Sequence, residues 1–107
     1  MSGDPRRRPQ RIRLRRQRDW RKPAGAIVVA RPSKWGNPFV IGPERSRADA
    51  VAAYERALVR GELDISIEDV RRELPGRDLA CWCPEHEPCH ADVLLRVAND
   101  DERSVRP

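Results

Sequence analysis

With 107 residues, the chain is long enough for one domain with a core of modest size. Charged residues make up 36% of it and aromatic residues 5%, which excludes a large hydrophobic core. With a small core, a cross-link such as a bound metal ion would contribute a larger share of the stability of the fold. No stretch approaches the roughly 20 apolar residues of a membrane span, and the start MSGDPRRRPQ lacks the apolar region of a secretory signal, so we expect a cytoplasmic protein with no membrane partner.

The net charge of +5 is unevenly distributed along the chain. Residues 1–22 carry nine arginines and one lysine against two aspartates, a net charge of +8, whereas the remainder carries −3 from 12 basic and 15 acidic side chains. Such a segment can bind the phosphate backbone of nucleic acid. A solvated tail is an equally good interpretation, because only Trp20 offers a ring for stacked bases. The candidate nucleic-acid contacts are Arg6, Arg7, Arg8, Arg11, Arg13, Arg15, Arg16 and Arg18.

The first predicted elements are two strands. Residues 1–10 are expected to form a flexible basic arm. In residues 11–15 apolar side chains alternate with arginines, which is the period of a half-buried strand. Residues 19–25 predict a turn, and the β-branched run at residues 26–30 is typical of a strand covered on both faces.

The stretch RPSKWGNPF, residues 31–39, cannot continue that strand because two prolines, a glycine and an asparagine interrupt it. It therefore predicts a loop of fixed shape. Its two large rings, Trp35 and Phe39, either pack into the core or contact a ligand.

Two helices with cap-like starts follow the loop. Ser46 to Asp49 begins the first helix, which Gly61 ends, and Ser66 to Asp69 begins a shorter one closed by residues 75–76. Residues 78–83 predict a second buried strand, and residues 88–92 open a final helix. Residues 99–107 are expected to form a flexible tail.

This order of elements predicts an α/β fold for residues 11–98: a small three-layer or two-layer domain with a short, mainly parallel sheet and about three helices. In open α/β sheets ligands bind beyond the carboxyl ends of the strands. The loops SKWGNPF and CPEHEPCH both follow such ends. We therefore expect the two loops to meet at one edge of the sheet.

The combination of RPSKWGNPF, a helix carrying a tyrosine, and LACWCPEHEPCHADVL resembles domain-of-unknown-function family 4326, a group of short bacterial and phage proteins. The resemblance covers about residues 26–98. It implies that the protein shares a functional site with the family and is located in the cytoplasm of a bacterium or a phage-infected host, but it implies no reaction. The acidic connector PEHEP, with His86, departs from the family pattern. The matching positions are Arg31, Lys34, Gly36, Asn37, Pro38, Phe39, Cys81, Cys83, Cys89, His90 and Asp92.

All three cysteines and both histidines fall within residues 81–90. An odd number of cysteines in a reducing compartment argues against a disulfide framework. One interpretation is a tetrahedral zinc site of the Cys3His type. The ligand count favours it, although one pair is C-x-C and the other is adjacent. The candidate metal ligands are Cys81, Cys83, Cys89 and His90.

A second interpretation is a pocket for a small ligand. A cysteine at a helix N-terminus has its thiolate stabilised by free amides, and the same place attracts phosphate. The candidate catalytic residues are then Cys89, His90 and Asp92, although Asp92 also suits a helix-dipole partner. The candidate ligand-binding residues are Arg31, Lys34, Trp35, Gly36 and Asn37.

A third interpretation makes Cys81, Cys83 and Trp82 core residues of a strand, with His90 capping a helix. Two functions follow from the first two interpretations. The protein binds a nucleotide-like or phosphorylated small molecule between the two loops, or it is a zinc-stabilised accessory module whose basic segment binds nucleic acid. The sequence assigns no reaction and no oligomeric state.

Overall fold

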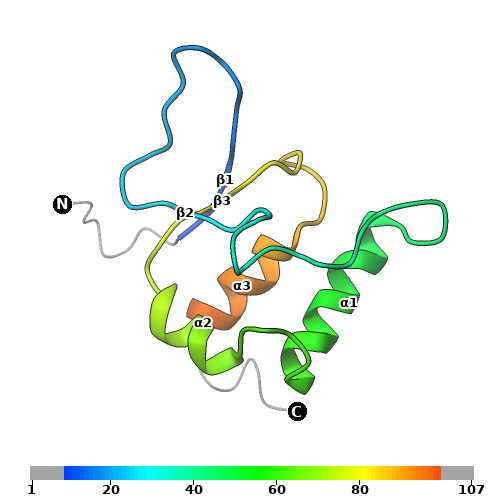
Figure 1. The fold of residues 1–107 in the computed structure, drawn as a ribbon. Coiled ribbons are helices and arrows are strands. Elements are labelled where there is room, and N and C mark those ends of the chain that lie inside the picture. Colours follow the sequence, from blue (N-terminus) through cyan, green and yellow to red (C-terminus); the bar gives the residue numbers. More distant parts are fainter. Residues whose placement is uncertain (1–8, 100–107) are drawn as a thin grey trace.

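The computed structural model describes residues 9–99 and contains three strands and three helices (Figure 1). In chain order they are β1 (Arg11–Arg13), β2 (Ile27–Val28), α1 (Arg47–Arg60), α2 (Ile67–Glu73), β3 (Leu79–Cys81) and α3 (His90–Asn99). The predicted small α/β domain with a parallel sheet and three helices is confirmed. The candidate contacts Arg6, Arg7 and Arg8 lie outside the described residues.

The sheet has the order β1-β3-β2, and both pairings are parallel. Arg11 pairs with Leu79 on one side of β3, and Ile27 pairs with Leu79 on the other. All three residues of β3 are at most 1% exposed, as a central strand requires. The strands are shorter than the predicted ranges 11–15, 26–30 and 78–83, and Pro32 and Pro84 keep β2 and β3 from continuing into the loops, since proline cannot donate to a ladder.

Capping residues set the ends of the first two helices. The Ser46 side chain accepts a hydrogen bond from the Asp49 amide at the start of α1, and Gly61 ends α1 with a φ of 74°. At the start of α2, Ser66 and Asp69 form a complete capping box. Within residues 9–99, no helix is long and apolar enough to cross a membrane.

Helix α3 lies at the centre of the packing, with five buried residues. It packs against β1 and β3, and α1 and α2 both pack against it (Figure 1). Leu94 of α3, Tyr54 and Leu58 of α1, Val70 of α2 and Leu79 of β3 are each at most 1% exposed and belong to one hydrophobic cluster. The burial of these side chains fixes the start of α3 beside the carboxyl end of the sheet.

The two unusual loops meet as the parallel topology predicts. Residues 31–39 leave the carboxyl end of β2, and residues 82–89 leave the same end of the neighbouring strand β3. A single pocket takes lining residues from both loops and from α1. The candidate site therefore lies at the edge of the sheet formed by the carboxyl ends of β2 and β3.

Candidate functional site

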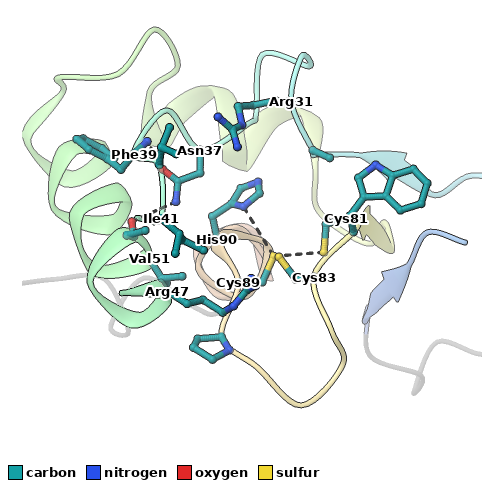
Figure 2. A pocket seen from close by; sticks show the side chains of 15 residues that line it. Arg31, Asn37, Phe39, Ile41, Arg47, Val51, Cys81, Cys83, Cys89 and His90 are labelled. Atoms are coloured by element: carbon teal, nitrogen blue, oxygen red, sulfur yellow. Dashed lines mark hydrogen bonds between the residues drawn. The ribbon is translucent and has the colours of Figure 1, made fainter. Parts of the chain in front are cut away.

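Three cysteine side chains converge at the carboxyl end of β3. Cys81 ends that strand, Cys83 follows two residues later, and Cys89 directly precedes α3. Their sulfur atoms all lie within 4.8 Å of one another, and the Cys89 thiol donates to the Cys81 sulfur at 3.2 Å (Figure 2). All three cysteines are free, so no disulfide joins them. The three cysteines lie close enough together to coordinate a metal ion.

His90 lies beside the sulfur atoms but outside that set. Its Nε2 is 2.7 Å from the Val29 carbonyl oxygen, and a carbonyl only accepts, so Nε2 carries the ring proton. The unprotonated Nδ1 faces Cys89 Sγ at 3.7 Å (Figure 2). Burial lowers the pKa of His90, which keeps the imidazole neutral at pH 7. Only the neutral ring can act as a ligand.

The three thiols do not titrate alike. Hydrogen bonding to the Cys81 and Cys89 thiols, followed by the positive charge of Arg47, holds the pKa of Cys83 far below its ordinary value. The same contacts raise the pKa of Cys89, although the Ala91 amide donates to its sulfur at 3.4 Å. The direction of these shifts favours negative charge on Cys83 over Cys89, the cysteine at the helix start. Three sulfur atoms this close together disfavour more than one negative charge unless a cation neutralises it.

The sulfur atoms form part of the wall of a pocket of about 350 Å³. Its apolar side consists of Phe39, Val40, Ile41 and Val51, and its polar side carries two arginines and one asparagine. The residues that line the pocket are Ala30, Arg31, Asn37, Phe39, Val40, Ile41, Arg47, Ala50, Val51, Cys81, Trp82, Cys83, Pro88, Cys89 and His90. Figure 2 shows Arg31, Asn37 and His90 around the same space.

The polar residues of the pocket have different roles. Asn37 donates to the Ala50 carbonyl and accepts from the Phe39 amide, so its side chain pins the loop to α1. Arg47 forms an ion pair with Glu87 at 2.7 Å, which ties α1 to the cysteine loop. Arg31 is exposed and makes no ion pair with any residue in the described range.

Gly36 supports Arg31 rather than a ligand. A Cβ atom at this position would lie 2.6 Å from Arg31 Cγ and 3.0 Å from the Arg31 backbone nitrogen. Only glycine allows the two backbones to approach this closely. Gly36 therefore helps to fix the position of Arg31, which lines the pocket.

Lys34 and Trp35, also predicted to bind ligand, do not line the pocket. Lys34 pairs with Glu73 at 2.8 Å and lies 4.8 Å from the centre of the Trp35 ring. Trp35 is 4% exposed, and Tyr54 donates to its carbonyl oxygen at 2.8 Å. Both side chains hold the loop to the helices, which leaves Trp35 no free face for a ligand.

Asp92 is also placed away from the pocket. Its Oδ2 accepts from Arg11 at 3.0 Å and from the Cys89 amide at 3.2 Å, so it caps the start of α3 and binds the first strand to it. Arg11 donates further to the carbonyls of Pro84 and Glu85, at 3.0 and 2.7 Å. Arg11, predicted as a nucleic-acid contact, therefore clamps the cysteine loop, and its side chain is 11% exposed.

The remaining described arginines of the basic segment stay at the surface. Arg13, Arg15, Arg16 and Arg18 are all exposed. Arg15 makes a 3.6 Å ion pair with Glu85, and Arg16 stacks over the Trp82 ring at 4.9 Å. Trp82, interpreted above as a core residue, is 45% exposed.

Sequence reasoning missed several pocket residues. The sequence pattern indicates Arg47 only as part of a helix start, and it places Val40 and Ile41 in no element. Val40 is 55% exposed and Ile41 is 46% exposed, and the chain turns back directly after them at the bridge between Gly42 and Arg45. Two adjacent apolar residues directly after a glycine- and proline-rich loop were the available signal.

The fold and the site together define a small α/β domain with a three-cysteine pocket at the carboxyl edge of its sheet. The chain belongs to the family described as Domain of unknown function (DUF4326), which matches residues 12–100. This match confirms the family resemblance inferred from the sequence. Comparison with curated proteins gives no match, and neither does comparison with solved structures.

Proposed function

We propose that this protein binds a nucleotide-like or phosphorylated small molecule in the pocket, and that a zinc ion held by Cys81, Cys83 and Cys89 fixes the shape of that pocket. One observation carries the proposal: three sulfur atoms within 4.8 Å of one another form part of the wall of a 350 Å³ pocket that two arginines also line. In this proposal the cysteines bind the metal ion, and the arginines and apolar side chains of the pocket bind the small molecule.

The spacing of the sulfur atoms supports zinc. Thiolates are preferred zinc ligands, and tetrahedral zinc with Zn–S bonds of about 2.3 Å places its sulfur ligands about 3.8 Å apart. The distance between Cys81 and Cys89 is 3.2 Å, and no distance in the set exceeds 4.8 Å, so small side-chain rotations suffice. Zinc would displace the protons that Cys81 and Cys89 retain without it.

His90 Nδ1 is the fourth ligand in this proposal. A sulfur and a nitrogen on one tetrahedral zinc lie about 3.6 Å apart, and Nδ1 is 3.7 Å from Cys89 Sγ. The ring must move toward the other two sulfur atoms, because it lies outside their set. The hydrogen bond from Nε2 to Val29 supports the assignment, since a second bond of this kind orients most ligating histidines.

The walls of the pocket favour a ligand with a flat apolar part and an anionic part. A volume of 350 Å³ falls within the range of small-molecule sites. Phe39, Ile41 and Val51 offer an apolar wall, and Arg31 offers a guanidinium that no described carboxylate neutralises. A nucleotide combines both parts, and α/β proteins bind such ligands at this edge of the sheet.

Elemental analysis of protein purified without a metal-binding tag tests the zinc site. We expect a stoichiometry of about one zinc per chain, lost in Cys83→Ser and reduced in His90→Ala. The matched control is His86→Gln, because His86 lies on the same loop with its side chain 84% exposed. Background zinc in the native protein, or full zinc in Cys83→Ser, would contradict the metal part of the proposal.

Isothermal titration calorimetry with ribonucleoside monophosphates and ADP tests the ligand. We expect Arg31→Gln to weaken binding by about tenfold, because a charge-assisted contact is lost. Arg56→Gln, an exposed position of α1 with the same change in charge, is the control. The ligand part is refuted if none of these probes binds at about 1 mM, or if both variants lose the same affinity.

A further inference from the structure

The Trp82 side chain is exposed although it directly follows the buried central strand. It follows the buried residue Cys81 at the end of the central strand, yet 45% of its surface is accessible. Leaving an indole in water forgoes the stabilisation that its burial would give. Trp82 is a lining residue of the pocket described above and also of a second hollow.

The second hollow is basic. Its volume is about 340 Å³, and it is lined by Arg13, Leu14, Arg15, Arg16, Gln17 and Trp82. The chain after β1 runs beside the end of β3, since the Leu14 amide donates to the Cys81 carbonyl at 2.7 Å. This contact holds the arginines against the tryptophan. We name these six residues the Trp82–arginine groove.

The charges of the groove are largely uncompensated. Within residues 9–99, neither Arg13 nor Arg16 forms an ion pair, and the pair between Arg15 and Glu85 is 3.6 Å long with both side chains exposed. An ion pair of that length and exposure is weak. The guanidinium of Arg16 lies 4.9 Å from the centre of the indole, in direct cation–π contact with one face of a ring that remains 45% exposed.

We propose that the Trp82–arginine groove binds single-stranded nucleic acid, with one base stacked on Trp82 and the neighbouring phosphates held by Arg13 and Arg16. Proteins that bind single strands without sequence preference combine a basic groove with an aromatic ring in this way. A duplex keeps its bases stacked inside and offers no base to the indole. This function is separate from the zinc and ligand pocket and stands without it.

Fluorescence anisotropy with a labelled single-stranded DNA of about 15 nucleotides tests the proposal on the full chain. Trp82→Ala should weaken binding by about tenfold, whereas Trp82→Phe should retain most of it because a phenyl ring still stacks. The double variant Arg13→Gln with Arg16→Gln should reduce the slope of log K against log salt by about 1.4, from about 0.7 for each phosphate contact.

The matched control is the double variant Arg56→Gln with Arg60→Gln, which removes the same charge from exposed positions of α1. Its salt slope should equal that of the native protein. The proposal is overturned if the two double variants behave alike, if Trp82→Ala binds as tightly as the native chain, or if a duplex of the same length binds as tightly as the single strand. Thermal unfolding of each variant identifies any loss that comes from misfolding, and the arginine variants keep the test valid if Trp82→Ala unfolds.

Discussion

Replacing Arg11 with glutamine should destabilise the whole domain, because this side chain joins three segments. It donates to Asp92 of α3 and to the carbonyls of Pro84 and Glu85, at distances between 2.7 and 3.0 Å, and its side chain is 11% exposed. Hydrogen bonds from a charged donor contribute about 1.5 kcal/mol or more each, and the exposed ion pair with Asp92 adds about 1 kcal/mol or less. After partial rehydration of the carbonyls, we expect a loss of about 2 to 4 kcal/mol in the free energy of unfolding.

Urea denaturation followed by circular dichroism measures this loss. Arg13→Gln is the matched control, since Arg13 lies on the same strand with an exposed side chain and should change stability by less than about 0.5 kcal/mol. If the two variants were equally stable, the clamp would have no energetic role. If Arg11→Gln retained native stability but lost affinity for single-stranded DNA, Arg11 would be a nucleic-acid contact after all.

Three further predictions concern the loop, the core and a helix cap. Gly36→Ala forces a shift of the Arg31 backbone and should cost about 1 to 3 kcal/mol in a denaturation experiment, whereas Gly42→Ala, with no atom within 4 Å of its Cβ, should be nearly neutral. Tyr54→Phe removes the donor to the buried Trp35 carbonyl and should lower the melting temperature by an amount that corresponds to about 1 to 2 kcal/mol; an unchanged melting temperature would contradict this role. Hydrogen bonding to the Ser66 amide, then to Arg72, lowers the pKa of Asp69 below its ordinary value of 3.8, so stability should fall as pH drops below 3.8, and Asp69→Asn should show a smaller acid loss.

The topology could be predicted from the sequence because it follows from local patterns and one rule of handedness. The apolar run at residues 26–30 and the stretch at residues 78–83 identified two parallel strands, and the loops after them were placed at one edge. Two apolar positions in residues 11–15 were enough to identify β1, which pairs with β3 over Arg11–Arg13. Alternation identified β1 and apolar stretches identified the other two strands, and neither kind of pattern depends on contacts that are distant in the sequence.

The assignment of individual side chains could not be predicted in the same way. The sequence suggests Asp92 as a catalytic acid, but its side chain binds Arg11, which lies 81 residues away in the sequence. No local pattern predicts a contact between residues so far apart. Trp35 and Lys34 stand in the same loop as Arg31, yet only the packing of α1 and α2 decides which of them faces the pocket. The sequence thus predicts where the loop lies, whereas tertiary contacts determine which of its side chains face the pocket.

Trp82 links the two proposed sites, since it is the one residue that lines both the three-cysteine pocket and the Trp82–arginine groove. A pocket ligand that shifts Trp82 must change the affinity of the groove, and thermodynamic linkage then requires the nucleic-acid strand to change the affinity of the pocket by the same factor. Titrating the labelled single strand with and without saturating nucleotide, and the nucleotide with and without saturating strand, gives both factors. Equal factors different from unity, abolished in Trp82→Ala, would establish the link. Factors of unity in both directions would mean that the pocket and the groove act independently.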